Sequence, residues 1–343
     1  MELKFGILGS GSWATALAKI LTDNGHTIHW WLRNEETIKA IHKYHHHPHY
    51  LTTVHFDVSL LKMSSNISEV IHHSNVVVVC IPSAYLLPAL FELPVDIFKN
   101  KKVVSAIKGI LPNPEHQLLN EFLEQSFGMK HEDYFTLMGP CHAEEVAAEK
   151  LSYLTFSGAA ASSTKKIASS FKTTYLNTII NHDIWGTQYA AVLKNIYAVG
   201  AGIAHGLDYG DNFLSVYIAN AANEMEKFLK KMQESILNKE STEIPPPALN
   251  YAASVYLGDL LVTCYSLFSR NRTFGNMIGK GYSVKVAQLE MNMVAEGYPA
   301  SKGIYHVNQS VGATMPITNT IYKILWEGLS AATGFKEIEK ILK

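Results

Sequence analysis

The sequence has few cysteines, no long apolar run and no excess of charge of either sign. Three of its 343 residues are cysteine, and Cys80, Cys141 and Cys264 lie too far apart for a disulfide framework or a metal site. No apolar stretch reaches the roughly 18 residues that a membrane span needs. The formal net charge is -1 without a charged tail, which argues against nucleic acid or an anionic membrane as a partner. No leader pattern opens the chain, so we expect a cytoplasmic protein without membrane insertion.

An ordinary globular composition accompanies these absences. Hydrophobic residues make up 47% of the chain and charged residues 17%, which supplies ample core material. The length suits two domains, and the sequence pattern changes near Asp183. We therefore expect a dinucleotide-binding domain over residues 1–183 and a helical substrate-binding domain over residues 184–343.

Before Asp183, short runs typical of strands alternate with helical periodicity. The run Val76–Val79 is β-branched throughout, which suits a central parallel strand buried on both faces. This alternation predicts an α/β domain with a Rossmann-like, doubly wound and mostly parallel sheet. The expected strands are residues 4–9, 27–32, 76–81, 103–107, 134–138, 154–157 and 178–180.

After Asp183 few β-branched runs remain, and the pattern predicts an all-α domain. The three consecutive prolines from Pro245 to Pro247 indicate an extended connection within the loop 239–250. The expected helices are residues 184–202, 212–232, 257–269, 283–293, 300–311 and 318–327.

A glycine turn follows the first expected strand. The residues Gly9, Ser10, Gly11, Ser12, Trp13 and Ala14 fit G-x-G-x-x-A between that strand and the first helix. The glycines allow a tight turn and a close approach of the backbone to a pyrophosphate, and the helix N-terminus favours its negative charge. The motif in this context predicts a dinucleotide site, although a tight turn that binds nothing would have the same sequence.

Arg33 stands at the end of the second expected strand, where a carboxylate would hold the ribose 2′-hydroxyl of NAD. A guanidinium can pair with a 2′-phosphate, so the sequence favours NADP over NAD. Stacking of Arg33 on an adenine remains an alternative.

Lys194 lies in the apolar run from Tyr189 to Gly200, with no acidic residue nearby in sequence. Burial of an ammonium lowers its pKa and is costly without a partner, which points to a functional lysine. The alternative is a lysine whose stem covers apolar neighbours while its ammonium reaches water.

Two other features suggest no site of their own. The histidines of the run His45–His49 lack cysteine or carboxylate support at ligand spacing, and we expect no metal there. Trp30 and Trp31 fit packing positions between helix and sheet better than a stacking site.

Several further segments, taken in order with the glycine turn, complete a pattern. Together they resemble the NAD(P)-dependent glycerol-3-phosphate dehydrogenase family over nearly the whole chain. The segments are residues 9–18, 81–83, 106–110, 139–146, 194–195, 201–207, 210–212, 258–264, 269–271 and 294–297.

The resemblance implies reversible hydride transfer between NAD(P)H and dihydroxyacetone phosphate, giving sn-glycerol 3-phosphate for glycerophospholipid synthesis. Lys194 would give and take the proton, and Asp259 would orient it, although Asp259 could also be a helix N-cap. Lys108 follows a buried strand, at the sheet edge where ligands bind in doubly wound folds. The resemblance makes it a contact of substrate and cofactor, whereas by itself it could be a solvated loop lysine.

The remaining site residues also follow from the resemblance. Arg270, with Ser269 and Asn271, suits a phosphate because a guanidinium, a hydroxyl and an amide occur together. Gly139, Cys141 and Asn195 are the other implied substrate contacts. The implied cofactor contacts are Gly9, Ser10, Gly11, Ser12, Trp13, Arg33, Lys108, Ala143, Arg270, Val294 and Glu296. A homodimer formed through the helical domain is implied as well.

Three positions depart from the family pattern. Cys141 replaces the usual serine or threonine, Asn220 stands where a basic residue is common, and the loop around Pro245–Pro247 is long. Two rival interpretations remain open: a dehydrogenase of the same plan acting on a hydroxy acid such as 6-phosphogluconate, and a nicotinamide-binding protein without turnover.

Overall fold

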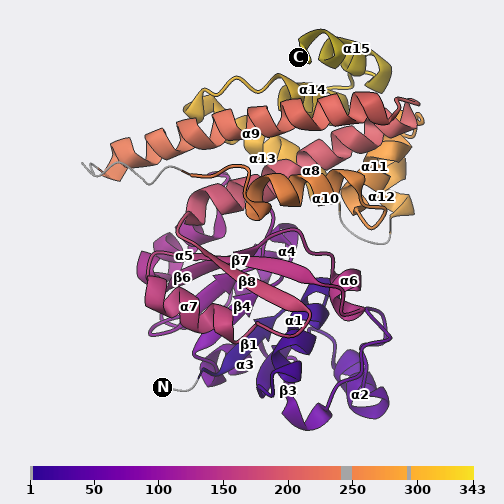
Figure 1. The fold of residues 1–343 in the computed structure, drawn as a ribbon. Helices are drawn as coiled ribbons and strands as arrows, with labels where there is room; N and C mark the ends of the chain where they lie inside the picture. Colours follow the sequence, from indigo (N-terminus) through magenta and orange to yellow (C-terminus); the bar gives the residue numbers. More distant parts are fainter. Residues whose placement is uncertain (1–2, 241–248, 292–294) are drawn as a thin grey trace. The chain divides into compact units, whose positions relative to one another are not determined.

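The computed structural model describes residues 3–240, 249–291 and 295–343, and its chain forms two compact units (Figure 1). Unit 1 comprises Met1–Ile107 and Gln117–Ile184, and unit 2 comprises Lys108–His116 and Trp185–Lys343.

The segment 108–116 belongs to unit 2, whereas the sequence division at residues 183 and 184 assigns it to the first domain. Its own contacts explain the difference. Ile110 packs at the position of Gly303, and the ring of His116 stacks on that of His306 at 4.5 Å between centroids. Apolar and ring contacts therefore hold this segment on unit 2, although it follows a strand of unit 1.

Unit 1 contains one eight-stranded sheet in the order β3-β2-β1-β4-β5-β6-β7-β8. The strands from β1 to β6 run parallel, β7 is antiparallel to β6, and β8 is parallel to β7. The doubly wound, mostly parallel sheet is thus confirmed. The strands are β1 (Phe5–Leu8), β2 (Ile28–Trp31), β3 (Leu61–Ser64), β4 (Val76–Val79), β5 (Lys102–Ser105), β6 (Tyr134–Met138), β7 (Ser152–Gly158) and β8 (Leu176–Asn181).

Burial accounts for the contrast between β4 and β3. All four valines of β4 are buried between β1 and β5, as a continuous apolar run predicts. The sequence pattern does not predict β3, an edge strand with a single buried residue, Leu61. The helices of unit 1 are α1 (Ser12–Asp23), α2 (Glu35–Tyr44), α3 (Ile67–His73), α4 (Ser83–Leu90), α5 (Leu119–Phe127), α6 (Ala143–Ala147) and α7 (Ala161–Ser169), with 3-10 turns η1 (Val58–Leu60) and η2 (His131–Asp133).

The described part of unit 2 contains helices and no strand, as expected. The expected helix 257–269 begins as a π-helix and ends at Tyr265, because Ser266 has an extended backbone. Two of the helices, α11 and α15, are not among the helices expected from the sequence. The elements are α8 (Ile184–Gly206), α9 (Asp211–Glu240), η3 (Ser254–Gly258, π-helix), α10 (Asp259–Tyr265), α11 (Arg270–Gly279), α12 (Val284–Glu290), α13 (Gly297–Val311), α14 (Pro316–Trp326) and α15 (Ala331–Ile341).

The expected proline-rich connection lies mainly outside the described residues, and α9 continues through its first two positions, 239 and 240. Among the helices that are described, none combines the length and apolarity required to cross a membrane.

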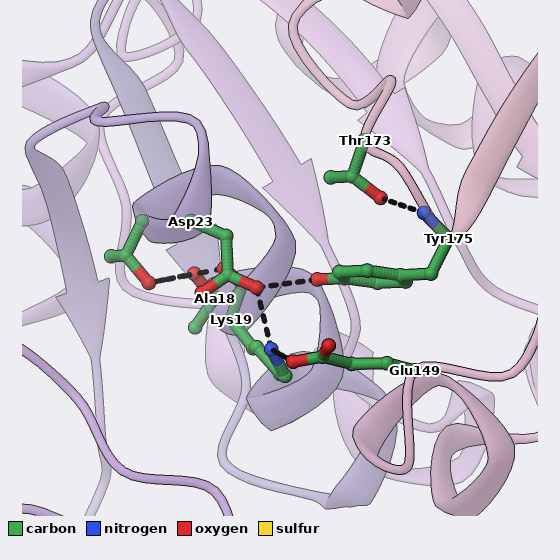
Figure 2. A network of polar contacts seen from close by, with 7 residues as sticks. Ala18, Lys19, Asp23, Glu149, Thr173 and Tyr175 are labelled. Carbon is green, nitrogen blue, oxygen red and sulfur yellow. Dashed lines mark hydrogen bonds and ion pairs between the residues drawn. The ribbon is translucent and has the colours of Figure 1, made fainter.

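A network of charges fixes the C-terminal end of α1 (Figure 2). The ammonium of Lys19 donates to Asp23 at 2.5 Å and to Glu149 at 2.9 Å, and it lies 4.9 Å from the ring centroid of Tyr175. The Tyr175 hydroxyl donates to the same Asp23 carboxylate at 2.6 Å. Burial alone would lower the pKa of Lys19, but its hydrogen bonds to the two carboxylates raise the pKa overall. The network joins α1 to the turn after α6 and to the residue before β8.

We expect Lys19→Met to lower the free energy of unfolding by about 1 to 3 kcal/mol, since it keeps the stem but leaves two carboxylates without their cation. The measurement is denaturant unfolding followed by circular dichroism. Lys130→Met is the matched control, because Lys130 pairs with Glu132 at 3.8 Å on the surface of the same unit and should contribute less than about 0.5 kcal/mol. Equal effects of the two substitutions would contradict a stabilising role for the network.

Candidate active site

The glycine turn lies between β1 and α1 in unit 1. Gly9 has a φ of +135°, and an added Cβ would lie 2.9 Å from the carbonyl oxygen of Cys80. Both conformation and space therefore require glycine there. At Gly11, the N-cap of α1, an added Cβ would meet no atom within 4 Å, so the backbone borders open space.

This surrounding fits the phosphates of a dinucleotide. The turn follows β1, whose neighbours β2 and β4 lead to opposite halves of the sheet, and ligands bind at such a switch point. Gly11 brings no side chain to cap α1, and the first turn of this helix has no acidic residue. The helix N-terminus can thus receive an anion without displacing a carboxylate.

Trp30 holds this turn from the neighbouring strand. It is fully buried on β2, and its indole Nε1 donates to the carbonyl oxygen of Gly9 at 2.7 Å. The expectation that Trp30 is a packing residue does not include this bond. A usable signal exists, because a buried indole N–H almost always requires an acceptor. Arg33 follows β2 on the exposed surface, at the strand end adjacent to that of β1.

Lys194 lies in the middle of α8 in unit 2 and is buried, with 4% of its surface exposed. Its ammonium donates to Oδ1 of Asp259, which is 1% exposed. Burial lowers the pKa of Lys194 to about 8; the charge of Asp259 opposes this shift and that of Lys108 adds to it. The buried position excludes the alternative in which the ammonium reaches bulk water.

Asp259 is the first residue of α10 and continues directly from the π-helix η3, so it is not the N-cap that one alternative suggests. Single π-helical turns often occur at functional sites. Thr263 donates its hydroxyl to the Asp259 carbonyl at 2.6 Å, which reinforces this start of the helix. The second carboxylate oxygen, Oδ2, is buried and has no hydrogen-bond partner among the described residues. A buried carboxylate oxygen of this kind is an acceptor that a bound molecule can use.

Glycines let three helices meet backbone to backbone around Lys194. A Cβ on Gly202 of α8 would overlap the carbonyl oxygen of Arg272, and one on Gly275 of α11 would overlap that of Val199. At the start of α13, a Cβ on Gly297 would overlap the carbonyl oxygen of Asn195. These contacts are not evident from the sequence, because a glycine within a helix does not indicate which residue it contacts.

Asn195 and Asn271 link four segments of unit 2 through their amides. Asn195 Nδ2 donates to the Lys108 carbonyl at 3.2 Å, and its Oδ1 accepts from Asn271 Nδ2 at 2.9 Å. Asn271 Oδ1 accepts from the backbone N–H of Gly297 at 2.9 Å. Each predicted substrate-contact amide therefore already has protein partners at both ends.

The three consecutive residues of the predicted phosphate site have different surroundings. Ser269 is buried as the N-cap of α11 and accepts from Arg272 N at 3.3 Å. Arg270 is exposed at the first helical position, and Asn271 is buried. Consecutive side chains on a helix face different directions, and of these three only Arg270 lies at the exposed surface of the helix N-terminus.

The other predicted contacts are dispersed along the chain. Gly139 has a φ of +132° after β6, and the Cys141 thiol donates to the Tyr153 carbonyl at 3.2 Å. Ala143 is buried at the start of α6 in the same unit. Glu296 is half-buried as the N-cap of α13 in unit 2. Val294 lies outside the described residues.

The histidine run organises its own loop. His47 is buried, and its Nδ1 accepts from the backbone N–H groups of His49 and Tyr50. Burial, together with His49 and His46, lowers the pKa of His47 to about 4, so it is neutral at neutral pH. Within the described ranges, no group of three or more histidine, cysteine or acidic side chains is arranged to hold a metal ion.

Comparison with known proteins agrees with both halves of this description. Residues 4–164 match the family model for the NAD-dependent glycerol-3-phosphate dehydrogenase N-terminus, and residues 183–336 match the one for its C-terminus. The chain belongs to the NAD-dependent glycerol-3-phosphate dehydrogenase family. Membership makes it an NAD(P)-dependent oxidoreductase, which confirms the predicted enzyme class and the predicted cofactor type.

Curated relatives align with this chain over nearly its whole length. It is 31% identical to glycerol-3-phosphate dehydrogenase [NAD(P)+] of Staphylococcus haemolyticus, over 98% of this chain and 97% of the relative. The protein of the same name from Macrococcus caseolyticus is 32% identical, over 98% of this chain and 97% of the relative.

Solved structures show the same fold. A glycerol-3-phosphate dehydrogenase from Coxiella burnetii superposes with a TM-score of 0.84 at 24% identity, and it covers 98% of each chain. The yeast glycerol-3-phosphate dehydrogenase superposes with a TM-score of 0.81 at 20% identity, over 99% of this chain and 100% of that one.

Proposed function

We propose that this dehydrogenase reduces the ketone of dihydroxyacetone phosphate to sn-glycerol 3-phosphate with NAD(P)H, reversibly. The observation that carries the proposal is the buried pair of Lys194 and Asp259, in which burial brings the pKa of Lys194 to about 8. Such a group can both give and take a proton near neutral pH. The names of the curated relatives support the choice of substrate.

In this reaction the nicotinamide, when bound, supplies the hydride to the carbonyl carbon. Lys194 gives its proton to the oxygen of the reduced carbonyl and is left as a neutral amine. In the oxidation direction the amine takes the proton back from the hydroxyl. Asp259 orients the ammonium through Oδ1, and its Oδ2 can accept a hydrogen bond from a substrate hydroxyl.

Lys108 adds positive charge beside Lys194, since its charge lowers the pKa of that residue. A cation in this position stabilises the negative charge that develops on the substrate oxygen. One carboxylate and two ammonium groups leave the cluster with net positive charge, which suits an anionic substrate.

Arg270 would hold the substrate phosphate at the N-terminus of α11, where a guanidinium and the helix dipole both favour an anion. Ser269, Asn271, Asn195, Gly139 and Cys141 remain proposed contacts of the substrate. The Cys141 thiol already donates its proton to the Tyr153 carbonyl, so this proton is not offered to the substrate.

Residues 9–13 would hold the cofactor pyrophosphate, and Arg33 the 2′-phosphate of NADP. Lys108, Ala143, Arg270, Val294 and Glu296 complete the proposed cofactor contacts. We also propose that the enzyme acts in the cytoplasm, forms a homodimer through unit 2 and supplies glycerophospholipid synthesis.

The pH dependence of the reaction tests the role of Lys194. Reduction requires the ammonium, so kcat/KM for dihydroxyacetone phosphate should fall as pH rises through about 8, while that for oxidation of glycerol 3-phosphate should rise. Above pH 7 the phosphate monoester is largely dianionic, since its second pKa is about 6, and does not obscure this change.

Lys194→Ala should lower turnover about 100-fold or more and remove this pH dependence. Lys227→Ala, which changes an exposed lysine of α9, is the control and should behave as wild type. Near-normal turnover of Lys194→Ala would rule out the proposed role. Activity of the wild type with 6-phosphogluconate and none with dihydroxyacetone phosphate would reject the substrate.

Arg270→Ala should raise the KM for dihydroxyacetone phosphate by about tenfold or more, because a charged anchor for the phosphate is lost. Steady-state kinetics with varied substrate measure this. Arg272→Ala removes the same charge two positions later, from a guanidinium that donates to the Tyr265 carbonyl, and should leave KM nearly unchanged. An unchanged KM in Arg270→Ala would place the phosphate site elsewhere.

We expect the wild type to prefer NADPH, and Arg33→Ala to lose this preference by raising the KM for NADPH more than that for NADH. Initial rates with each coenzyme give the ratio. Lys39→Ala, on the exposed part of α2, is the control for a general loss of positive charge. A wild-type preference for NADH would contradict the assignment of Arg33.

A further inference from the structure

The amides of Asn195 and Asn271 form a chain of hydrogen bonds from the Gly297 N–H to the Lys108 carbonyl, which we call the relay. Each bond in the relay has a fixed donor and acceptor. At one end the backbone N–H of Gly297 can only donate, so Asn271 must present Oδ1 to it. At the other end the Lys108 carbonyl can only accept, so Asn195 must present Nδ2. The oxygen of Asn195 then faces the nitrogen of Asn271, and the middle bond is satisfied in this orientation alone.

Burial makes this direction consequential. Asn195 is 5% exposed and Asn271 is 8% exposed, so water cannot easily replace a lost partner. An amide left unsatisfied at such a site is destabilising, because its lost hydration is not replaced by a hydrogen bond. Loss of the correct acceptor at the Gly297 end therefore also breaks the bond at the Lys108 end, because reversing the amide of one asparagine forces the amide of the other to reverse as well.

Lys108 is the residue of the relay whose side chain acts on the proposed proton donor, Lys194. It begins the segment 108–116, whose other end is held on α13 by the stacked rings of His116 and His306. The bond from Asn195 fixes the backbone of Lys108 beside α8, and hence the position from which its ammonium acts on Lys194. Asn271 touches neither lysine through these bonds, yet it determines the orientation of the amide that holds Lys108.

We propose that Asn271 and Asn195 are positioning residues that act through Lys108, by holding its carbonyl so that its ammonium stands beside Lys194. This role is separate from any direct contact of the two amides with substrate, and its kinetic consequence rests on the proposed function.

Asn271→Asp is the informative substitution. A carboxylate still accepts from Gly297, but its second oxygen now faces the oxygen of Asn195. Asn195 must turn to donate, and its own oxygen then opposes the Lys108 carbonyl. We expect kcat for dihydroxyacetone phosphate reduction to fall about 10- to 100-fold, as small misplacements of catalytic groups do.

A double-mutant cycle separates positioning from direct action. In the Lys108→Ala background, Asn271→Asp should cause little further loss of kcat and little further shift of the pH profile. If the new carboxylate acts directly on substrate or on Lys194, the two losses multiply, and the proposal is wrong. Asn271→Ser, which breaks the relay without adding charge, repeats the cycle should the aspartate variant fold poorly.

Asn308→Asp is the matched control. Asn308 lies further along α13 and bridges the N–H and carbonyl of Ala313 with one amide, at 2.9 Å for each bond. It should lose a similar hydrogen bond without any change in kcat.

Hydrogen–deuterium exchange of residues 108–116 tests the relay independently of any substrate. Exchange should quicken in Asn271→Asp and stay at the wild-type rate in Asn308→Asp. Unchanged exchange in Asn271→Asp would overturn the relay, just as multiplying kinetic losses would. If the wild type does not reduce dihydroxyacetone phosphate but exchange quickens in Asn271→Asp as expected, the proposed function is rejected and the relay stands.

Discussion

The close approach of α8, α11 and α13 is the constraint on which the arrangement around Lys194 depends. Gly202, Gly275 and Gly297 let backbone meet backbone, with no room for a single added methyl group. This contact brings the start of α11 and the start of α13 to the middle of α8. Without it, the relay of amides could not span three helices, because asparagine side chains are short.

The charge of Lys194 is subject to opposing influences in its buried site. Lys194 has one carboxylate partner and a second ammonium nearby, so its charged form is stabilised by Asp259 and opposed by both burial and Lys108. Such a balance is a poor way to stabilise a fold, because an ion pair in the interior rarely repays its desolvation. It is a suitable way to keep a lysine close to its titration point, as the proposed proton transfer requires.

The sequence predicts the sheet and its dinucleotide turn because both depend on local patterns. The valine run of β4 and the spacing of Gly9 and Gly11 can be recognised without knowing which distant residues they contact. Lys194 could be identified as unusual, since an ammonium in an apolar helix requires a reason. The membership of residues 108–116 in unit 2 and the Asn195–Asn271 pairing could not be predicted. For Trp30, the need for an acceptor could be predicted, but not that the acceptor is the carbonyl of Gly9. Each of these contacts joins residues far apart in sequence, and no local propensity encodes its geometry.

The bond from Trp30 to Gly9 also determines what the turn offers to a ligand. A carbonyl and the following N–H share one planar, trans peptide unit and point in opposite directions. Since the buried indole of Trp30 holds the Gly9 oxygen, the N–H of Ser10 is directed away from the indole before anything binds. The entropic cost of orienting this donor has thus been met during folding, and a phosphate that arrives there does not have to meet it again.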